Sequence, residues 1–101
     1  MNDGASSADA GIGTLRRTLA IANKRGLHAR AAAKFVRTVG QFDANVRVEF
    51  KGQQVSGLSI MGLMMLAAGI GSEIEIACSG RQAVEAMAAL SALVEGKFGE
   101  E

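Results

Sequence analysis

The sequence predicts an α+β fold in which one antiparallel sheet is covered on one face by helices, with the element order βαββαβα. Several short stretches alternate apolar and polar residues, which is the pattern of a strand with one buried face. Two longer stretches repeat apolar residues every three or four positions, as amphipathic helices do, and a shorter apolar stretch follows a capping serine. Runs this short, joined by hairpin and helical connections, favour a single sheet with helices on one side.

The first strand is predicted at residues 15–21, where apolar side chains mostly alternate with polar ones. Residues 23–26 form a loop. An amphipathic helix is predicted over residues 29–39, because its apolar residues share one face: Ala32, Phe35, Val36 and Val39. Gly40 is expected to end this helix, whose outer side is basic.

A hairpin is predicted next, with strands at residues 45–50 and 53–56. Ser59 caps a short helix that begins at Ile60 and ends near Gly69. Alternation predicts the fourth strand at residues 73–78. The last helix is predicted from Gln82 to about Lys97, with an apolar face that consists of Val84, Met87, Leu90 or Ser91, and Val94.

The chain is long enough for one domain with a single core, predicted at residues 14–101 of the 101. Residues 1–13 are rich in small residues and Asp and are expected to be a disordered tail; they have no secretory-signal pattern. The longest apolar stretch, residues 58–70, is too short to span a bilayer. We therefore expect a soluble, cytoplasmic monomer with no membrane partner, which agrees with its single cysteine.

Composition also excludes several classes of function. The formal net charge is only +1 and the aromatic residues are four Phe, which argues against nucleic-acid binding. One His and one Cys cannot build a zinc or iron–sulfur site, and no nucleotide-binding glycine motif occurs. We expect no metal and no cofactor, and we interpret Cys78 as a small buried residue.

The only histidine, His28, stands directly before the predicted helix at residues 29–39. The N-terminus of a helix carries unpaired amides and a partial positive charge, so it favours an anion. Phosphate is the obvious anion. A neutral imidazole is a competent nucleophile, and backbone amides of Ala29 and Arg30 can point at phosphoryl oxygens while Arg30 adds a full charge.

Two motifs together resemble the HPr family, the histidine-containing phosphocarriers of the phosphoenolpyruvate-dependent phosphotransferase system. The first is Gly-Leu-His-Ala-Arg at residues 26–30, followed by Ala-Ala-Lys-Phe-Val, and the second is Ser-Ile-Met-Gly at residues 59–62. The resemblance implies an open-faced sandwich with a four-stranded antiparallel sheet and three helices on one face. It also implies that Nδ1 of His28 takes a phosphoryl group from enzyme I and passes it to an enzyme IIA protein, as a carrier and not an enzyme.

One residue departs from the family pattern: Ala31 stands where proline is common after the motif arginine. Proline fits the first turn of a helix, and alanine adds an N–H donor and some unfolded-state entropy, a stability change of about 0.4–1 kcal/mol. We expect the transfer chemistry to survive. The departure leaves open whether the chain serves sugar uptake or a regulatory, nitrogen-related system.

Three basic residues of the first helix, Arg30, Lys34 and Arg37, share one side at spacings of four and three. Such a pattern usually indicates only a basic helix face that is exposed to solvent. We favour docking roles for Arg30 and Arg37 and leave Lys34 undecided.

Ser59 is either a plain helix cap or a regulatory phosphorylation site, because in many HPr proteins the matching serine is phosphorylated by HPr kinase/phosphorylase. A short helix cannot bury every side, so some of its apolar residues remain for partners. By the resemblance, Ile60, Met61 and Met64 are expected to form the docking face.

Two other functions remain as alternatives. An RNA-binding module shares the βαββαβ order but needs exposed strand aromatics and positive charge that this chain lacks. A regulatory adaptor, whose phosphorylation state partners sense without sugar transport, differs from a carrier only in its acceptor.

Overall fold

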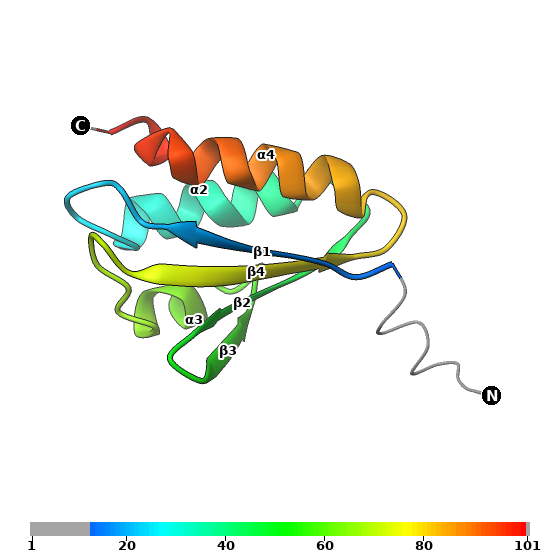
Figure 1. Ribbon diagram of the computed structural model, residues 1–101. Coiled ribbons are helices and arrows are strands. Elements are labelled where there is room, and N and C mark those ends of the chain that lie inside the picture. Colours follow the sequence, from blue (N-terminus) through cyan, green and yellow to red (C-terminus); the bar gives the residue numbers. More distant parts are fainter. Residues whose placement is uncertain (1–12, 101) are drawn as a thin grey trace.

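The computed structural model describes residues 13–100, so the expected N-terminal tail lies outside the described residues except for Gly13. Their helices and strands follow the predicted βαββαβα order (Figure 1). In chain order they are β1 (Leu15–Ala20), α2 (Ala29–Val39), β2 (Asn45–Phe50), β3 (Gln53–Ser56), α3 (Ile60–Met65), β4 (Glu73–Ser79), α4 (Ala83–Glu95) and the 3-10 turn η1 (Lys97–Gly99).

The four strands form one antiparallel sheet in the order β1-β4-β2-β3. Helix α4 contacts β1 and β4, α2 lies beside α4, and α3 lies against α2 and β3 (Figure 1). The predicted fold class is confirmed. Among residues 13–100, every helix is too short or too polar to cross a bilayer.

The core lies between the helices and the inner face of the sheet. Alternate strand residues enter it, as a period of two requires, and so do the apolar faces of the helices. Its fully buried members include Val48, Ile74, Ile76, Cys78, Ala32, Phe35, Leu63, Leu90 and Val94. The expectation that Cys78 is buried is confirmed, and burial raises the pKa of its thiol.

The last helix ends earlier than predicted. Helix α4 stops at Glu95, and the next turn is not a continuation, because Lys97, Phe98 and Gly99 have positive φ angles of 59°, 55° and 76°. A left-handed backbone costs a non-glycine residue roughly 1–2 kcal/mol, so packing must hold this turn. Phe98 supplies that packing, since its side chain is fully buried.

The predicted apolar face of the last helix is wrong at one position. Val84 is 67% exposed, whereas Ala83 and Ala86 are buried. Residues 83, 87, 90 and 94 follow the three-and-four spacing of one stripe, and Val84 lies one residue, about 100° of helix rotation, away from it.

Candidate functional site

His28 occupies the N-cap of α2, with an extended backbone (φ −73°, ψ 176°) and no capping hydrogen bond from its side chain. The amide of Ala32 donates to the carbonyl of His28 at 2.8 Å. Within residues 13–100, no hydrogen bond uses the amides of Ala29, Arg30 or Ala31. The imidazole therefore stands beside the free donors that a helix start leaves for an anion, as the sequence predicts.

The loop before His28 reaches this position because Gly26 allows a close approach. Gly26 has φ +64°, and a Cβ atom there would lie 2.4 Å from the carbonyl oxygen of Ala68. The same oxygen accepts a hydrogen bond from the amide of Leu27 at 3.0 Å. The loop is thus fixed against the segment that follows α3.

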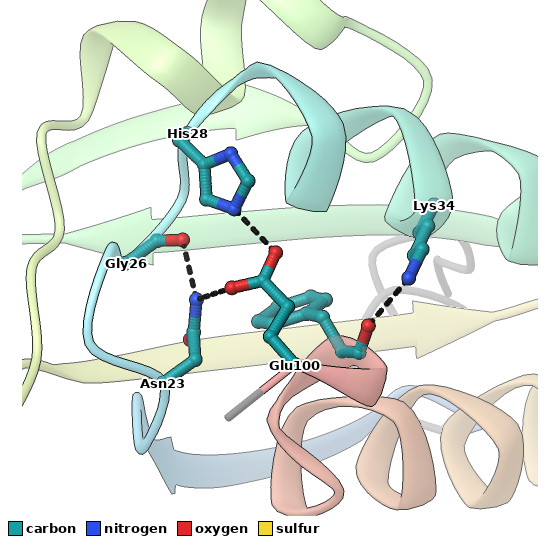
Figure 2. A network of polar contacts seen from close by, with 6 residues as sticks. Asn23, Gly26, His28, Lys34 and Glu100 are labelled. Atoms are coloured by element: carbon teal, nitrogen blue, oxygen red, sulfur yellow. Dashed lines mark hydrogen bonds and ion pairs between the residues drawn. The ribbon is translucent and has the colours of Figure 1, made fainter.

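The imidazole ring of His28 contacts the side chain of Glu100. Its Nε2 lies 2.5 Å from Oε2 of Glu100, and the two side chains are only 14% and 18% exposed (Figure 2). The His28 side chain is therefore mostly covered, because the C-terminal turn lies against one edge of the ring. A carboxylate only accepts hydrogen bonds, so this contact assigns the ring proton to Nε2. Within residues 13–100, Nδ1 has no hydrogen bond.

Two further hydrogen bonds hold the C-terminal turn at the site. Lys34 Nζ donates to the carbonyl oxygen of Phe98 at 2.7 Å (Figure 2). Asn23 Nδ2 donates to Oε1 of Glu100 at 3.1 Å and to the carbonyl oxygen of Gly26 at 2.8 Å. Lys34, whose role the sequence leaves undecided, thus contacts the turn at residues 97–99.

The charge of Glu100 follows from its neighbours. Burial acts to raise the pKa of this carboxyl, but the hydrogen bonds from His28 and Asn23, and the charges of His28 and Arg25, lower it further than burial raises it. The net pKa is below its ordinary value. Glu100 is therefore ionised at neutral pH and can accept from both donors.

Two cavities border the His28–Glu100 pair. One of about 250 Å³ is lined by Lys24, Arg25, Arg30 and Glu100. The other, about 190 Å³, is lined by Arg25, Leu27, His28 and residues 67–69. Three positive side chains thus border these two cavities, and their charge suits a phosphoryl group or an acidic partner.

The other predicted docking arginine lies farther away. Arg37 is exposed in the last turn of α2, about 10 Å along the helix axis from Arg30. It borders neither cavity at His28. The structure therefore separates Arg30, at the site, from Arg37, on the surface beyond it.

Ser59 is the N-cap of α3, as predicted, and its Oγ accepts a hydrogen bond from the amide of Gly62 at 2.8 Å. The predicted docking residues Ile60, Met61 and Met64 are 39%, 68% and 38% exposed. Leu63 of the same helix is fully buried. Three further apolar side chains near this helix in the sequence are also exposed: Leu58, Met65 and Ile70.

Comparison with known proteins identifies the family. The family described as the PTS HPr component phosphorylation site matches residues 15–96 of the chain. The chain belongs to the HPr family. HPr proteins are phosphocarriers of the phosphotransferase system and not catalytic enzymes, so the sequence-based assignment is confirmed at this level.

The similar proteins carry both HPr and NPr names. Phosphocarrier protein HPr of Cupriavidus necator is 50% identical over 86 residues, which are 85% of this chain and 97% of that protein. Phosphocarrier protein NPr of Shewanella violacea is 41% identical over 86 residues, 85% of this chain and 94% of that protein. A crystal structure of HPr from Thermoanaerobacter tengcongensis has a TM-score of 0.82 at 42% identity and covers 86% of this chain and 98% of its own.

Glu100, Asn23 and Arg25 are the site residues that the sequence pattern does not indicate. Asn23 and Arg25 belong to the loop directly before His28, so their position in the sequence is a usable signal. Glu100 lies 72 residues from His28. No local pattern relates those two positions. Within residues 13–100, no cluster of His, Cys, Asp and Glu could hold a metal ion.

Proposed function

We propose that His28 accepts a phosphoryl group on Nδ1 from phosphorylated enzyme I and passes it to an enzyme IIA protein. One observation carries the choice of atom: Nε2 is engaged by Glu100, and Nδ1 remains without a hydrogen bond at the start of α2. A nucleophile with its proton held on the far nitrogen needs no base to remove one.

The transfer balances without any further reactant. The lone pair of Nδ1 attacks phosphorus, the bond between phosphorus and the donor breaks, and the donor keeps that electron pair. The proton of His28 stays on Nε2, and the ring gains positive charge that the Glu100 carboxylate offsets. Transfer to the acceptor reverses these events.

Positive groups stabilise the moving phosphoryl group. The free amides of Ala29 and Arg30 and the Arg30 guanidinium are the groups that we assign to it, and Arg25 adds charge from the loop. Phosphoryl transfer depends mainly on such positioning and charge stabilisation. Arg37 is assigned to partner docking from its exposed place in α2.

The surface of α3 is proposed as the docking face for enzyme I and the enzyme IIA protein, through Ile60, Met61 and Met64. Phosphorylation of Ser59 by an HPr kinase/phosphorylase would place a dianion beside these apolar residues. We assign Ser59 to regulation of docking, separate from the carrier site, and place the relay in the cytoplasm with the protein acting as a monomer. A solved relative is described as an HPr dimer, so the oligomeric state is part of this proposal.

A regulatory adaptor is the second candidate, because the relatives include both an HPr and an NPr protein. In that function the same phosphohistidine forms, but partners sense it without sugar transport. The two candidates differ in the acceptor and not in the chemistry of His28.

The decisive experiment incubates the protein with phosphoenolpyruvate and enzyme I and maps the label by mass spectrometry under mildly alkaline conditions. We expect acid-labile phosphate on His28 only. His28→Ala should abolish the label and keep the fold, as checked by circular dichroism. Label retained in that variant would refute the assignment.

A further inference from the structure

Asn23 is a buried amide at the base of the site. Its side chain is fully buried, and within residues 13–100 the only other buried polar residue is Ser91. Both hydrogens of Nδ2 are used, one by Gly26 and one by Glu100. Since both partners are oxygens, only the nitrogen of the amide can face them. Burying an amide costs free energy unless its hydrogen bonds are made. Nδ2 makes both of its bonds, whereas Oδ1 is buried and has no partner among the described residues, so the Nδ2 contacts determine how the side chain lies.

Glu100 needs such a partner because its backbone is weakly determined by local preference. It follows a left-handed turn in which two residues, Lys97 and Phe98, are not glycine. Phe98 and Lys34 anchor the turn, through a buried ring and through a hydrogen bond to the Phe98 carbonyl oxygen. Among the described residues, Asn23 and His28 are the side chains that hydrogen-bond it.

We propose that Asn23 is a positioning residue for the carrier site: it holds Glu100 in the orientation that keeps the His28 proton on Nε2 and Nδ1 free. A carboxylate bonded to one ring nitrogen fixes the tautomer of a histidine, and groups that orient such a carboxylate act on the histidine through it. The chain of contacts runs from Gly26 through Asn23 and Glu100 to Nε2. This inference rests on the proposed role of His28.

The experiment reads the tautomer directly, in unphosphorylated protein labelled with ¹⁵N, from the shifts of the two ring nitrogens of His28 and the Nε2–H signal. In the unsubstituted protein we expect an Nε2–H tautomer with a proton signal protected from exchange. Asn23→Ala should lose that protection and shift both nitrogens toward a mixture. Transfer from enzyme I should slow by about tenfold, the lower end of the loss of about 10–100-fold that follows removal of a hydrogen-bond partner of a metal-binding histidine.

A double-mutant cycle separates action through Glu100 from a simple loop defect. Glu100→Ala removes the carboxylate and leaves the Asn23–Gly26 contact. If Asn23 acts through Glu100, Asn23→Ala changes the ring shifts no further in the Glu100→Ala background. Ser91→Ala, which removes the other buried polar side chain, is the matched control and should leave the His28 signals unchanged.

Several results would overturn the inference. An unchanged tautomer in Asn23→Ala, or an equal shift with and without Glu100, would make Asn23 a loop-stabilising residue only. If Asn23→Ala fails to fold, the side-chain amide signals of Asn23 test the contact instead. Glu100→Ala should shift one of the two Nδ2 proton signals of Asn23, and unchanged signals would refute the contact. Absence of phosphohistidine in the unsubstituted protein would refute the proposed function while leaving the tautomer measurement valid.

Discussion

The amide of Leu27 donates a hydrogen bond to the carbonyl oxygen of Ala68, at 3.0 Å. Leu27 precedes His28, and Ala68 follows α3, so this one bond joins the loop before His28 to the end of the proposed docking helix. Gly26 makes the approach possible, because any side chain there would meet the same oxygen.

Gly26→Ala should therefore destabilise the protein more than Gly52→Ala. Both glycines have positive φ, +64° and +80°, and the left-handed backbone alone costs alanine roughly 1–2 kcal/mol at either position. At Gly26 the added Cβ would also lie 2.4 Å from Ala68 O, whereas Gly52 has nothing within 4 Å. Urea unfolding of both variants measures the difference, and equal losses would show that the loop relaxes freely.

Arg30→Ala should slow transfer from enzyme I more than Lys34→Ala. Arg30 lines the cavity beside Glu100, so its loss removes a positive donor near the phosphoryl group, and we expect an effect of at least about tenfold. Lys34 donates to Phe98 O, so its loss costs mainly stability, about 1 kcal/mol. Transfer kinetics and unfolding curves test both variants. Equal kinetic losses would mean that only the overall positive field matters.

Phosphorylation of Ser59 should weaken enzyme I binding by on the order of 1–3 kcal/mol, the usual scale of a regulatory coupling. The new dianion lies next to the exposed side chains of Ile60 and Met61, where an acidic partner would meet a like charge. Thermal stability should stay level or rise, because the phosphate faces the start of α3. The measurement is the rate of His28 phosphorylation at subsaturating protein, with true phosphoserine and without it. Equal rates would leave Ser59 as a helix cap only.

The contact of Glu100 with His28 should make the C-terminal turn sensitive to acid. The pKa of Glu100 is lowered in the folded protein, so its stabilising effect is complete above the ordinary value of 4.5 and is lost as pH falls through the folded pKa. Glu100→Gln should remove this contribution. Unfolding free energies of both proteins from neutral pH to about pH 3 give the difference. A difference that does not shrink with acid would contradict the assignment.

Local pattern is enough to predict most of the fold and the centre of the site. Three elements depend only on residues close together in the chain, so a short stretch of sequence is enough to predict them: the helix at residues 29–39, the hairpin and the Ser59 cap. The position of His28 at a helix start follows in the same way. The prediction of the buried face of α4 fails at Val84, because apolar residues lie on more than one side of this helix. Which side is buried depends on what packs against the helix.

The sequence by itself determined the element order, the helix start that presents His28, and the capping role of Ser59, because each arises from residues close together in the chain. Only the tertiary structure decided that Glu100 meets Nε2 of His28, that Lys34 binds the terminal turn, and that the imidazole is largely covered. The physical reason is the turn at Lys97–Gly99. Local preference disfavours its left-handed backbone, and burial of Phe98 in the assembled core holds it there.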